Sequence, residues 1–358
     1  MKTSNFNFLI NVRALNAPFS GVQRYLSDLL PGITSGLLAN GIISRTISTR
    51  HTGIKAHLWE QTTAAITEND KLLWSPASTG PILRKNQILT IHDLQQLDHP
   101  EWFNAKFQLG YKFIVPLVAR QCRHVIAISN FTKKRIVDRC KIPEEKISVI
   151  HNGINSRFHP IEKDSIIPIL NKLKLPSDKY ILCVGGLKPN KNLKNTLICW
   201  KKLSKSLPDD LWLYIVGVKD LNSKDIDCGD LIGLPKIKFL GFINDTDLPY
   251  LISGSKLFIF LSYYEGFGFP ILEAMACGVP VVSSNATSLT EIANESAMLC
   301  DPDDIISICN CIKLLYYSID KRTEFIKKGL ENVKSFTLET SVSKYISLFH
   351  KLYIKKLQ

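Results

Sequence analysis

The chain has 358 residues, of which 45% are hydrophobic and 22% are charged, and its formal net charge is +13. This composition is that of an ordinary globular protein, which excludes a disordered, collagen-like or coiled-coil chain. The length exceeds what one hydrophobic core usually organises, so we expect two domains. The positive charge favours an anionic partner, such as a nucleic acid, a phosphorylated compound or an acidic membrane surface.

The N-terminal segment and the cysteines indicate the cellular compartment in which the protein is expected. The first residues, MKTSNFNFLINV, contain too short an apolar run for a signal peptide, and no run of 18 apolar residues follows. The nine cysteines form no CxxC pair and no cluster with zinc-type spacing. We therefore predict a cytoplasmic protein with reduced, mostly buried thiols and without a metal site.

Short apolar runs alternate with helix-length periodic segments along the chain. This pattern is typical of βαβ units and of parallel sheets. In chain order, the predicted strands are Phe6–Val12, Ile88–Ile91, His124–Ile128, Ile147–Ile150, Tyr180–Val184, Leu211–Val216, Ile237–Leu240, Leu257–Leu261 and Val279–Ser283.

A proline-containing stretch without a strand pattern separates the two groups of strands. We predict a linker at residues 161–178, between an N-terminal lobe at 1–160 and a C-terminal lobe at 179–335, with an amphipathic helix at 336–358. The fold class is therefore α/β, with two doubly wound, Rossmann-like lobes that face a central cleft. Ligands of such sheets bind beyond the carboxyl ends of the strands.

The most informative segment is SYYEGFGFPILEAMACGVPVVSS, residues 262–284. A strand runs into the loop Gly266-Phe267-Gly268, and a helix begins near Pro270, a residue suited to a first helical turn. Amides at such a helix start favour an anion. Glu265 and Glu273 bracket this turn, and a carboxylate can accept hydrogen bonds from two vicinal hydroxyls of a sugar. The alternative is that Glu265 caps a helix and Glu273 is solvated.

The string EGFGFPILEAMACGVPVVSS resembles the signature of the retaining glycosyltransferases of family 4 (glycosyl transferases group 1), which have the GT-B fold. Other segments agree in the family's order, so the resemblance covers nearly the whole chain: NAPFSGVQRYLSDLL, ILTIHDL, HVIAISNFTKKRI, ISVIHNGI and VGGLKPNKNLKNTL. The GVQRY, HDL and HPEWF segments look most like bacterial mannosyltransferases of surface polysaccharides. The resemblance also implies that the helix at 336–358 packs back on the N-terminal lobe.

The resemblance implies roles for the residues of the glycine-rich segment. Glu273 would hold the ribose hydroxyls of a donor nucleotide, and Glu265 would contact the transferred sugar as a catalytic residue. The backbone at Gly266, Phe267 and Gly268 would line the sugar hydroxyls or the phosphates.

It implies further roles elsewhere in the chain. Lys191 would neutralise the donor pyrophosphate, for which a lysine supplies a compact positive charge. Gly21 would let the first loop approach the diphosphate, and His92 would be catalytic, close to the anomeric carbon. Phe242 would lie against the nucleobase. Without the resemblance, a histidine such as His92 at the end of a buried strand is more often a hydrogen-bonded core residue.

The phosphate loop departs from the family's pattern. Members usually pair the lysine with an arginine a few residues earlier or immediately before it, whereas this sequence has Gly186 and Asn190 there. Lys188 is the candidate that would reach the same phosphate in place of the missing arginine, and it is therefore counted among the donor-binding residues. The missing arginine keeps open the alternative of a catalytically idle subunit of a polysaccharide-assembly complex.

The resemblance implies transfer of a sugar from a nucleoside diphosphate to a saccharide acceptor with retention at the anomeric carbon and without a metal or cofactor. We favour GDP-mannose as the donor and a lipid-linked saccharide as the acceptor, in bacterial polysaccharide or O-antigen assembly. A UDP- or dTDP-sugar transferase is the alternative.

The segment Trp102–Arg123 mixes aromatic and basic residues. We interpret it either as a peripheral contact with the acidic inner face of the membrane or as an ordinary helix with a solvated basic face. The sequence has no recognisable nucleic-acid motif, so we expect no nucleic-acid partner.

Overall fold

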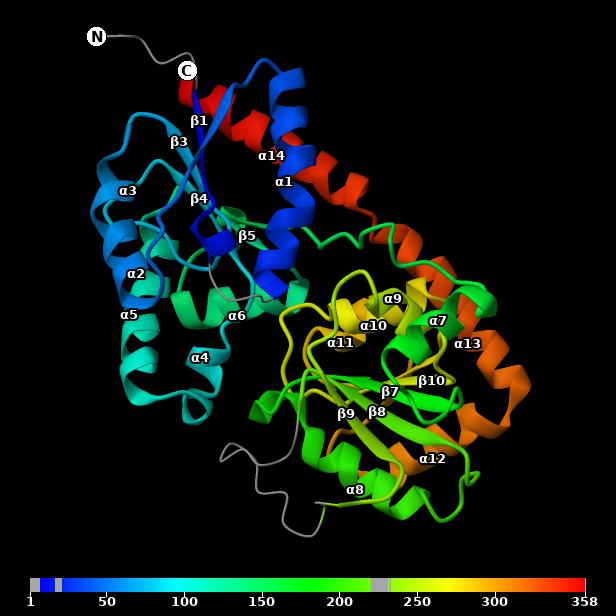
Figure 1. The fold of residues 1–358 in the computed structure, drawn as a ribbon. Helices are drawn as coiled ribbons and strands as arrows, with labels where there is room; N and C mark the ends of the chain where they lie inside the picture. Colours follow the sequence, from blue (N-terminus) through cyan, green and yellow to red (C-terminus); the bar gives the residue numbers. More distant parts are fainter. Residues whose placement is uncertain (1–6, 17–20, 220–230, 232, 358) are drawn as a thin grey trace. The chain divides into compact units, whose positions relative to one another are not determined.

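The structure is a computed structural model that describes residues 7–16, 21–219, 231 and 233–357. The chain forms two compact units, which we call unit 1 (Met1–Gly153 with Phe336–Gln358) and unit 2 (Ile154–Ser335). Each unit contains one six-stranded sheet with flanking helices (Figure 1). All strand pairs are parallel. The predicted fold class, two Rossmann-like α/β lobes, is confirmed.

The sheet of unit 1 has the strand order β2-β1-β3-β4-β5-β6. Its strands are β1 (Phe8–Asn11), β2 (Ser44–Ile47), β3 (Leu72–Ser75), β4 (Gln87–Ile91), β5 (His124–Ala127) and β6 (Ile147–Val149). Its helices are α1 (Gly21–Ala39), α2 (Gly53–Gln61), α3 (Thr63–Ile66), α4 (Gln95–Asp98), α5 (Ala105–Gln121), α6 (Asn130–Cys140) and α14 (Leu338–Leu357).

Apolar side chains on both faces bury the sheet of unit 1. Leu89 and Ile91 of β4 belong to one core cluster with Val115 and Val118 of α5 and Ile136 of α6. Nearly continuous apolar runs are what a parallel sheet covered on both faces requires. Since the strands end at the same edge, the loops that follow β1, β3 and β4 are brought together there.

The C-terminal helix α14 packs on α1 within unit 1. The hydroxyls of Tyr25 and Tyr345 lie 2.6 Å apart in a buried hydrogen bond, and the Phe349 ring packs 5.1 Å from the Phe8 ring. A Cβ atom at Gly36 of α1 would lie only 2.7 Å from Ile346 Cγ1, so this glycine permits the close approach of the two helices. The apolar stripe of α14 is therefore part of the core of unit 1.

The sheet of unit 2 has the strand order β12-β11-β10-β7-β8-β9. Its strands are β7 (Tyr180–Val184), β8 (Trp212–Val216), β9 (Ile237–Gly241), β10 (Leu257–Phe260), β11 (Val281–Ser284) and β12 (Met298–Cys300). Its helices are α7 (Lys163–Lys172), α8 (Leu193–Leu203), α9 (Leu248–Ser253), α10 (Phe269–Ala276), α11 (Leu289–Ala293), α12 (Ile305–Tyr317) and α13 (Ile319–Asn332).

The structure differs from the sequence-based prediction between the two groups of strands. The predicted linker at 161–178 contains α7, whose Ile166 and Leu170 are buried, and it belongs to unit 2. These two residues stand four positions apart, a helical spacing that the prolines obscured. The two units meet in the chain between Gly153 and Ile154 rather than at residue 161.

Two strands of unit 1, β2 and β3, were not predicted. β2 has the sequence SRTI and lies at the edge of the sheet, where polar side chains reach solvent. β3 has only four residues, LLWS. Of the predicted strand Phe6–Val12, residue 6 lies outside the described part of the chain, and β1 covers Phe8–Asn11, one residue short of the prediction at Asn7 and at Val12.

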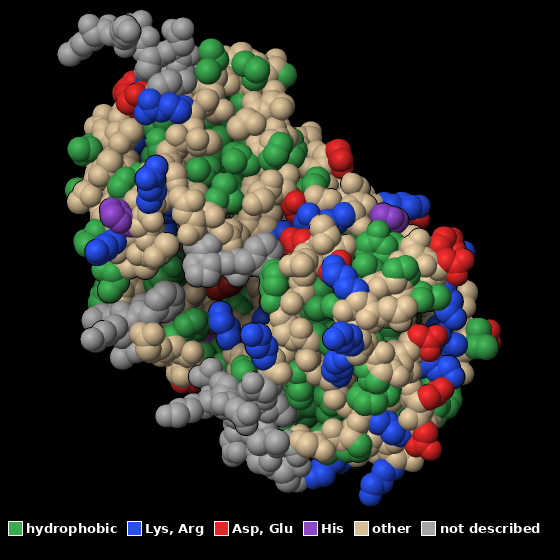
Figure 2. Space-filling model, viewed as in Figure 1, with side chains coloured by type: hydrophobic (Ala, Val, Ile, Leu, Met, Phe, Trp, Pro, Cys, Tyr) green, Lys and Arg blue, Asp and Glu red, His purple; other side chains and the backbone are tan. Residues whose placement is uncertain are grey.

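Two surface features complete the description. On the face shown in Figure 2, basic side chains of unit 2 are interspersed with acidic ones rather than gathered into one stripe. Within the described residues, no helix combines the length and the apolar character needed to span a membrane.

Candidate functional site

Two loops meet at the carboxyl edge of the sheet in unit 2. Strand β7 leads into η4 (Pro189–Lys191), and β10 leads into the glycine-rich segment before α10. Because β7 and β10 are parallel neighbours in the sheet, both loops leave the same edge side by side. This is the position at which doubly wound sheets bind ligands.

Lys191 and Glu265 form an ion pair across these two loops. The distance from Lys191 Nζ to Glu265 Oε1 is 2.6 Å, and the side chains are 25% and 15% exposed. The ammonium group also lies 5.3 Å from the centre of the Phe260 ring. A short charge-assisted hydrogen bond in a half-buried place fixes both groups in one geometry. The structure thus brings together two of the residues that the sequence singled out.

The glycine-rich loop is held in one shape by the start of α11. Ser288 Oγ donates to the carbonyl oxygens of Glu265 (2.9 Å) and Phe267 (2.6 Å), and Thr287 Oγ1 accepts from the Glu265 amide (3.1 Å). Gly268 has φ +129°, and a Cβ there would lie 2.8 Å from Leu289 Cδ2. Only glycine fits this backbone without strain.

Helix α10 follows directly and carries the second glutamate. Pro270 stands in its first turn, and Glu273, one turn further along the chain, is 3% exposed. The helix dipole stabilises a carboxylate near a helix N-terminus. Phe267 is buried, and its ring packs edge-on against the Phe269 ring with the ring centres 5.2 Å apart, so the ring is part of the packing of the loop.

Two other predicted donor-binding residues follow strands at the same sheet edge, Lys188 after the central strand β7 and Phe242 after the edge strand β9. Lys188 is exposed and precedes η4. Phe242 follows β9 and is 63% exposed. Lys188 and Phe242 are therefore open to solvent, while Gly266 is buried within the loop.

Gly21 and His92 belong to unit 1. Gly21 is the first residue of α1, and residues 17–20 of the predicted glycine loop lie outside the described part of the chain. His92 follows β4 and is 7% exposed; its ring packs edge-on at 4.6 Å against Tyr25, one turn after Gly21. The His92 Nε2 atom lies 2.7 Å from the Pro76 carbonyl oxygen, which assigns the proton to Nε2. A ligand can therefore only be met by Nδ1 as an acceptor.

Burial lowers the pKa of His92 to about 4, although the hydrogen bond to the Pro76 carbonyl opposes the shift. The unfolded chain, with a histidine pKa near 6.5, binds the proton more readily. Stability linked to His92 is therefore present above about pH 6.5 and is lost as the pH falls toward 4. Between pH 7 and pH 5 we expect a loss of about 2 kcal/mol, from about 1.4 kcal/mol per pH unit.

Urea unfolding of the wild type and of His92→Gln at both pH values measures this loss. A glutamine retains an amide that can donate to the Pro76 carbonyl but has no titrating group. The variant should lose about 2 kcal/mol less than the wild type on acidification. Equal losses in both proteins would show that burial does not lower the pKa of His92 below its value in the unfolded chain. Burial also lowers the pKa of His124 to about 4. Because His124 is present in both proteins, it contributes equally to the loss of stability in each.

Sequence reasoning missed the asparagines that join the loops. Asn190 Nδ2 donates to the Tyr264 carbonyl (3.1 Å), and the Asn190 carbonyl accepts from the Tyr263 amide (2.7 Å). Asn192, at φ 51°, donates to the Pro302 carbonyl at 2.9 Å. Asn190, one of the two positions at which the resemblance leads us to expect an arginine, thus ties the loop after β7 to the glycine-rich loop. The signal that could have found Asn192 is the tolerance of asparagine for the left-handed conformation.

The described residues contain no group of His, Cys, Asp and Glu side chains arranged to hold a metal ion. What the edge of unit 2 offers instead is the lysines Lys188 and Lys191, the carboxylates of Glu265 and Glu273, and a constrained loop before a helix start. These are the groups that hold an anionic, hydroxylated ligand such as a sugar nucleotide.

Comparison with known proteins agrees with this reading. Residues 168–332 match the model of the glycosyl transferases group 1, and residues 69–158 match that of glycosyltransferase family 4. The chain is 28% identical over 285 residues to the O-antigen chain mannosyltransferase B of Escherichia coli, covering 78% of this chain and 74% of that protein. It is 30% identical over 257 residues to the O-antigen chain mannosyltransferase RfbU of Salmonella typhimurium, covering 68% and 65%.

Solved structures share the fold across nearly the whole chain. The Anabaena protein Alr3699/HepE, in complex with UDP and glucose, superimposes with a TM-score of 0.75 at 18% identity, covering 96% of this chain and all of that one. WaaG, a glycosyltransferase involved in lipopolysaccharide biosynthesis, gives 0.72 at 14% identity, covering 95% and 99%. With the GT-B architecture and both family models in place, the chain belongs to the glycosyltransferases of family 4 and glycosyl transferases group 1.

Proposed function

We propose that this glycosyltransferase moves mannose from GDP-mannose to a saccharide acceptor, presented on a lipid, in bacterial O-antigen assembly, with retention at the anomeric carbon. The observation that carries the proposal is the Lys191–Glu265 pair, a cation and a carboxylate 2.6 Å apart beside the glycine-rich loop. The mannosyltransferase names of the two bacterial relatives support the choice of sugar and pathway.

The reaction requires the site to stabilise two developing charges in the transition state. When the bond from sugar to diphosphate breaks, negative charge grows on the leaving phosphate and positive charge on the sugar ring. Lys191 supplies the cation for the phosphate, with Lys188 and the start of α10 as further donors, and Glu265 lies where it can stabilise the sugar. Glu273 is proposed to hold the ribose hydroxyls, Phe242 to lie against the base, and Gly21 to let the first loop approach the diphosphate.

The proposed displacement takes place on one face of the sugar. The acceptor oxygen forms the new bond to the anomeric carbon as the bond to GDP breaks, and the acceptor proton passes to the leaving phosphate oxygen. His92, neutral with Nδ1 as an acceptor, is proposed to lie near the anomeric carbon and to receive a hydrogen bond from the sugar. No metal ion is assigned a step.

The test uses purified protein with GDP-mannose and octyl α-D-mannopyranoside as the acceptor probe. We expect GDP release together with a disaccharide whose one-bond carbon–proton coupling identifies an α-linkage, at rates that EDTA leaves within about twofold. A β-linked product would overturn retention. Transfer from UDP- or dTDP-sugars without transfer from GDP-mannose would overturn the donor assignment.

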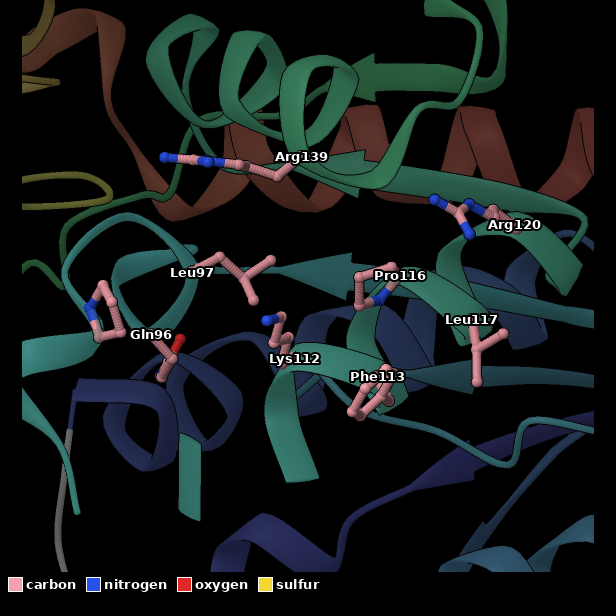
Figure 3. A pocket seen from close by; sticks show the side chains of 9 residues that line it. Gln96, Leu97, Lys112, Phe113, Pro116, Leu117, Arg120 and Arg139 are labelled. Carbon is pink, nitrogen blue, oxygen red and sulfur yellow. The ribbon is translucent and has the colours of Figure 1, made fainter. Parts of the chain in front are cut away.

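A hollow on unit 1 supports the proposed contact with an acidic membrane surface. It holds about 500 Å³ and is lined by α5 together with α4, Pro100 and Arg139 of α6 (Figure 3). Phe113 and Leu117 on α5 are 57% and 39% exposed, and Lys112 and Arg120 flank them. Exposed apolar side chains between basic ones are typical of helices that rest on anionic lipid. The side chains of residues 105–109, which include Lys106 and Phe107, lie outside the described part of the chain.

The double variant Lys112→Glu/Arg120→Glu should bind phosphatidylglycerol vesicles at least about 30-fold more weakly than the wild type, at about 1 kcal/mol for each basic residue lost. Vesicle flotation at low salt measures this binding. Lys85→Glu, an exposed lysine elsewhere on unit 1, is the matched control. Wild-type protein that stays at the bottom of the gradient would rule out the membrane contact.

A further inference from the structure

A second cluster of polar side chains lies at the carboxyl edge of the sheet in unit 1. Asn11 is the last residue of β1, Arg13 begins η1 (Arg13–Asn16), and Thr79 follows β3. His57 and Glu60 project from α2, one turn apart. The topology therefore assembles five polar side chains from four segments at the edge where such sheets bind ligands.

The buried carboxylate of Glu60 organises this cluster. Glu60 is 0% exposed, and its Oε1 atom accepts from Asn11 Nδ2 (2.9 Å) and from Arg13 Nε (2.7 Å). The other arm of the Arg13 guanidinium donates to the Thr79 hydroxyl. Burial raises the pKa of Glu60, but His57, the Arg13 charge and the hydrogen bonds outweigh it, so the pKa is lowered and the carboxylate is charged.

The second oxygen of this carboxylate lacks a hydrogen bond. Glu60 Oε2 and His57 Nδ1 are both buried without a hydrogen-bond partner among the described residues, and they lie 3.8 Å from each other. Buried charged oxygens are costly to leave unsatisfied. A hydroxyl group placed beside both atoms can donate to Oε2 and accept from an Nδ1 proton. The cluster thus holds a buried carboxylate oxygen and a buried ring nitrogen that no described side chain satisfies with a hydrogen bond.

The solvent side of the cluster suits a sugar ring. The His57 and Arg13 side chains are 27% and 13% exposed, so the cluster reaches solvent at these two residues. The Tyr111 ring of α5 packs edge-on against His57, with ring centres 5.9 Å apart. Arg13 and Glu60 both act electrostatically on the Tyr111 hydroxyl, as does Asp93 after β4. Carboxylate, guanidinium and aromatic groups together match the hydroxyls and the apolar face of a pyranose.

We propose that Arg13, His57, Glu60 and Tyr111 bind the hydroxyl groups of the terminal pyranose of the acceptor saccharide. This inference rests on the proposed function, since it assigns the acceptor side of the same transfer. The residues are positioning residues, because they orient the acceptor and take no proton in the reaction. The cluster shares no residue with the groups that are proposed to hold the donor.

The test separates acceptor binding from donor turnover. In His57→Ala and Tyr111→Leu, we expect the KM for octyl α-D-mannopyranoside to rise at least about 10-fold, as for loss of hydrogen bonds to charged or buried groups. The KM for GDP-mannose and its slow hydrolysis by water should stay within about twofold. His51→Ala, an exposed histidine before α2, is the matched control and should change neither value.

The outcomes distinguish the two claims. A wild type that transfers the sugar, with variants whose acceptor KM is unchanged, overturns the acceptor site while the proposed function stands. A wild type that turns over no donor overturns the proposed function and this inference with it. Glu60→Gln leaves Arg13 without its charged partner, so it is informative only if its thermal unfolding matches that of the wild type. In that case an unchanged acceptor KM also counts against the site.

Discussion

Glu265→Ala is expected to reduce sugar transfer at least about 100-fold, the loss found when one preorganised electrostatic group is removed from a site. The affinity for GDP should stay within a few fold. Glu265 faces the sugar in our account, and its removal leaves Lys191 with no partner at 2.6 Å but still able to meet the diphosphate. Transfer assays and titration with GDP measure the two quantities separately.

The matched control for this change is Glu324→Ala. Glu324 also pairs with lysines, Lys321 and Lys328 at 2.8 Å, but on an exposed face of α13. Its loss should leave both transfer and affinity near the wild-type values, since exposed pairs contribute little. If Glu265→Ala instead lost GDP affinity as strongly as transfer, its assigned role at the sugar would be wrong.

Lys191→Ala should weaken binding of GDP and GDP-mannose by about 10- to 100-fold, the range for one hydrogen bond to a charged group. The turnover number should fall as well, because the leaving phosphate gains charge in the transition state. Lys191 is also the partner of a half-buried glutamate, so its loss leaves Glu265 at 15% exposure without its cation. Equilibrium titration and single-turnover assays follow the two effects.

Lys194→Ala is the control for Lys191, as Lys194 stands one turn further along on α8 and is exposed. We expect affinity within twofold of the wild type. Lys188→Ala should give an intermediate loss, because Lys188 is exposed beside the same loop. Equal binding by Lys191→Ala and the wild type would place the diphosphate elsewhere.

Most of the sheet framework could be predicted because its strands are buried on both faces. β7 and β10 read as continuous apolar runs that soon lead to glycine or serine, which is the pattern of strands in a parallel sheet covered on both faces. β2 escaped prediction because an edge strand buries only part of its side chains. Helix α7 escaped it because Pro168 stands inside the helix.

The candidate site was predicted in its residue types but not in its contacts. Glu265 and Glu273 could be found from their spacing around the glycines. Lys191 lies 74 residues before Glu265, and the two pair because β7 and β10 are neighbours in the sheet. No local sequence pattern predicts that these two strands are neighbours. Asn190 and Glu60 were overlooked for the same reason, because each contacts residues that are distant in the sequence.

The most direct test of the account is a thermal-shift panel of GDP, UDP, dTDP and CDP sugars with their parent diphosphates. We predict the largest rise with GDP-mannose, several degrees at about 100 times the Kd, where binding adds about 2.7 kcal/mol. The rise should shrink in Lys191→Ala. If no nucleotide stabilises the wild type, the chain is a catalytically idle subunit, and the phosphate loop with Asn190 in place of arginine is the first place to look for the cause.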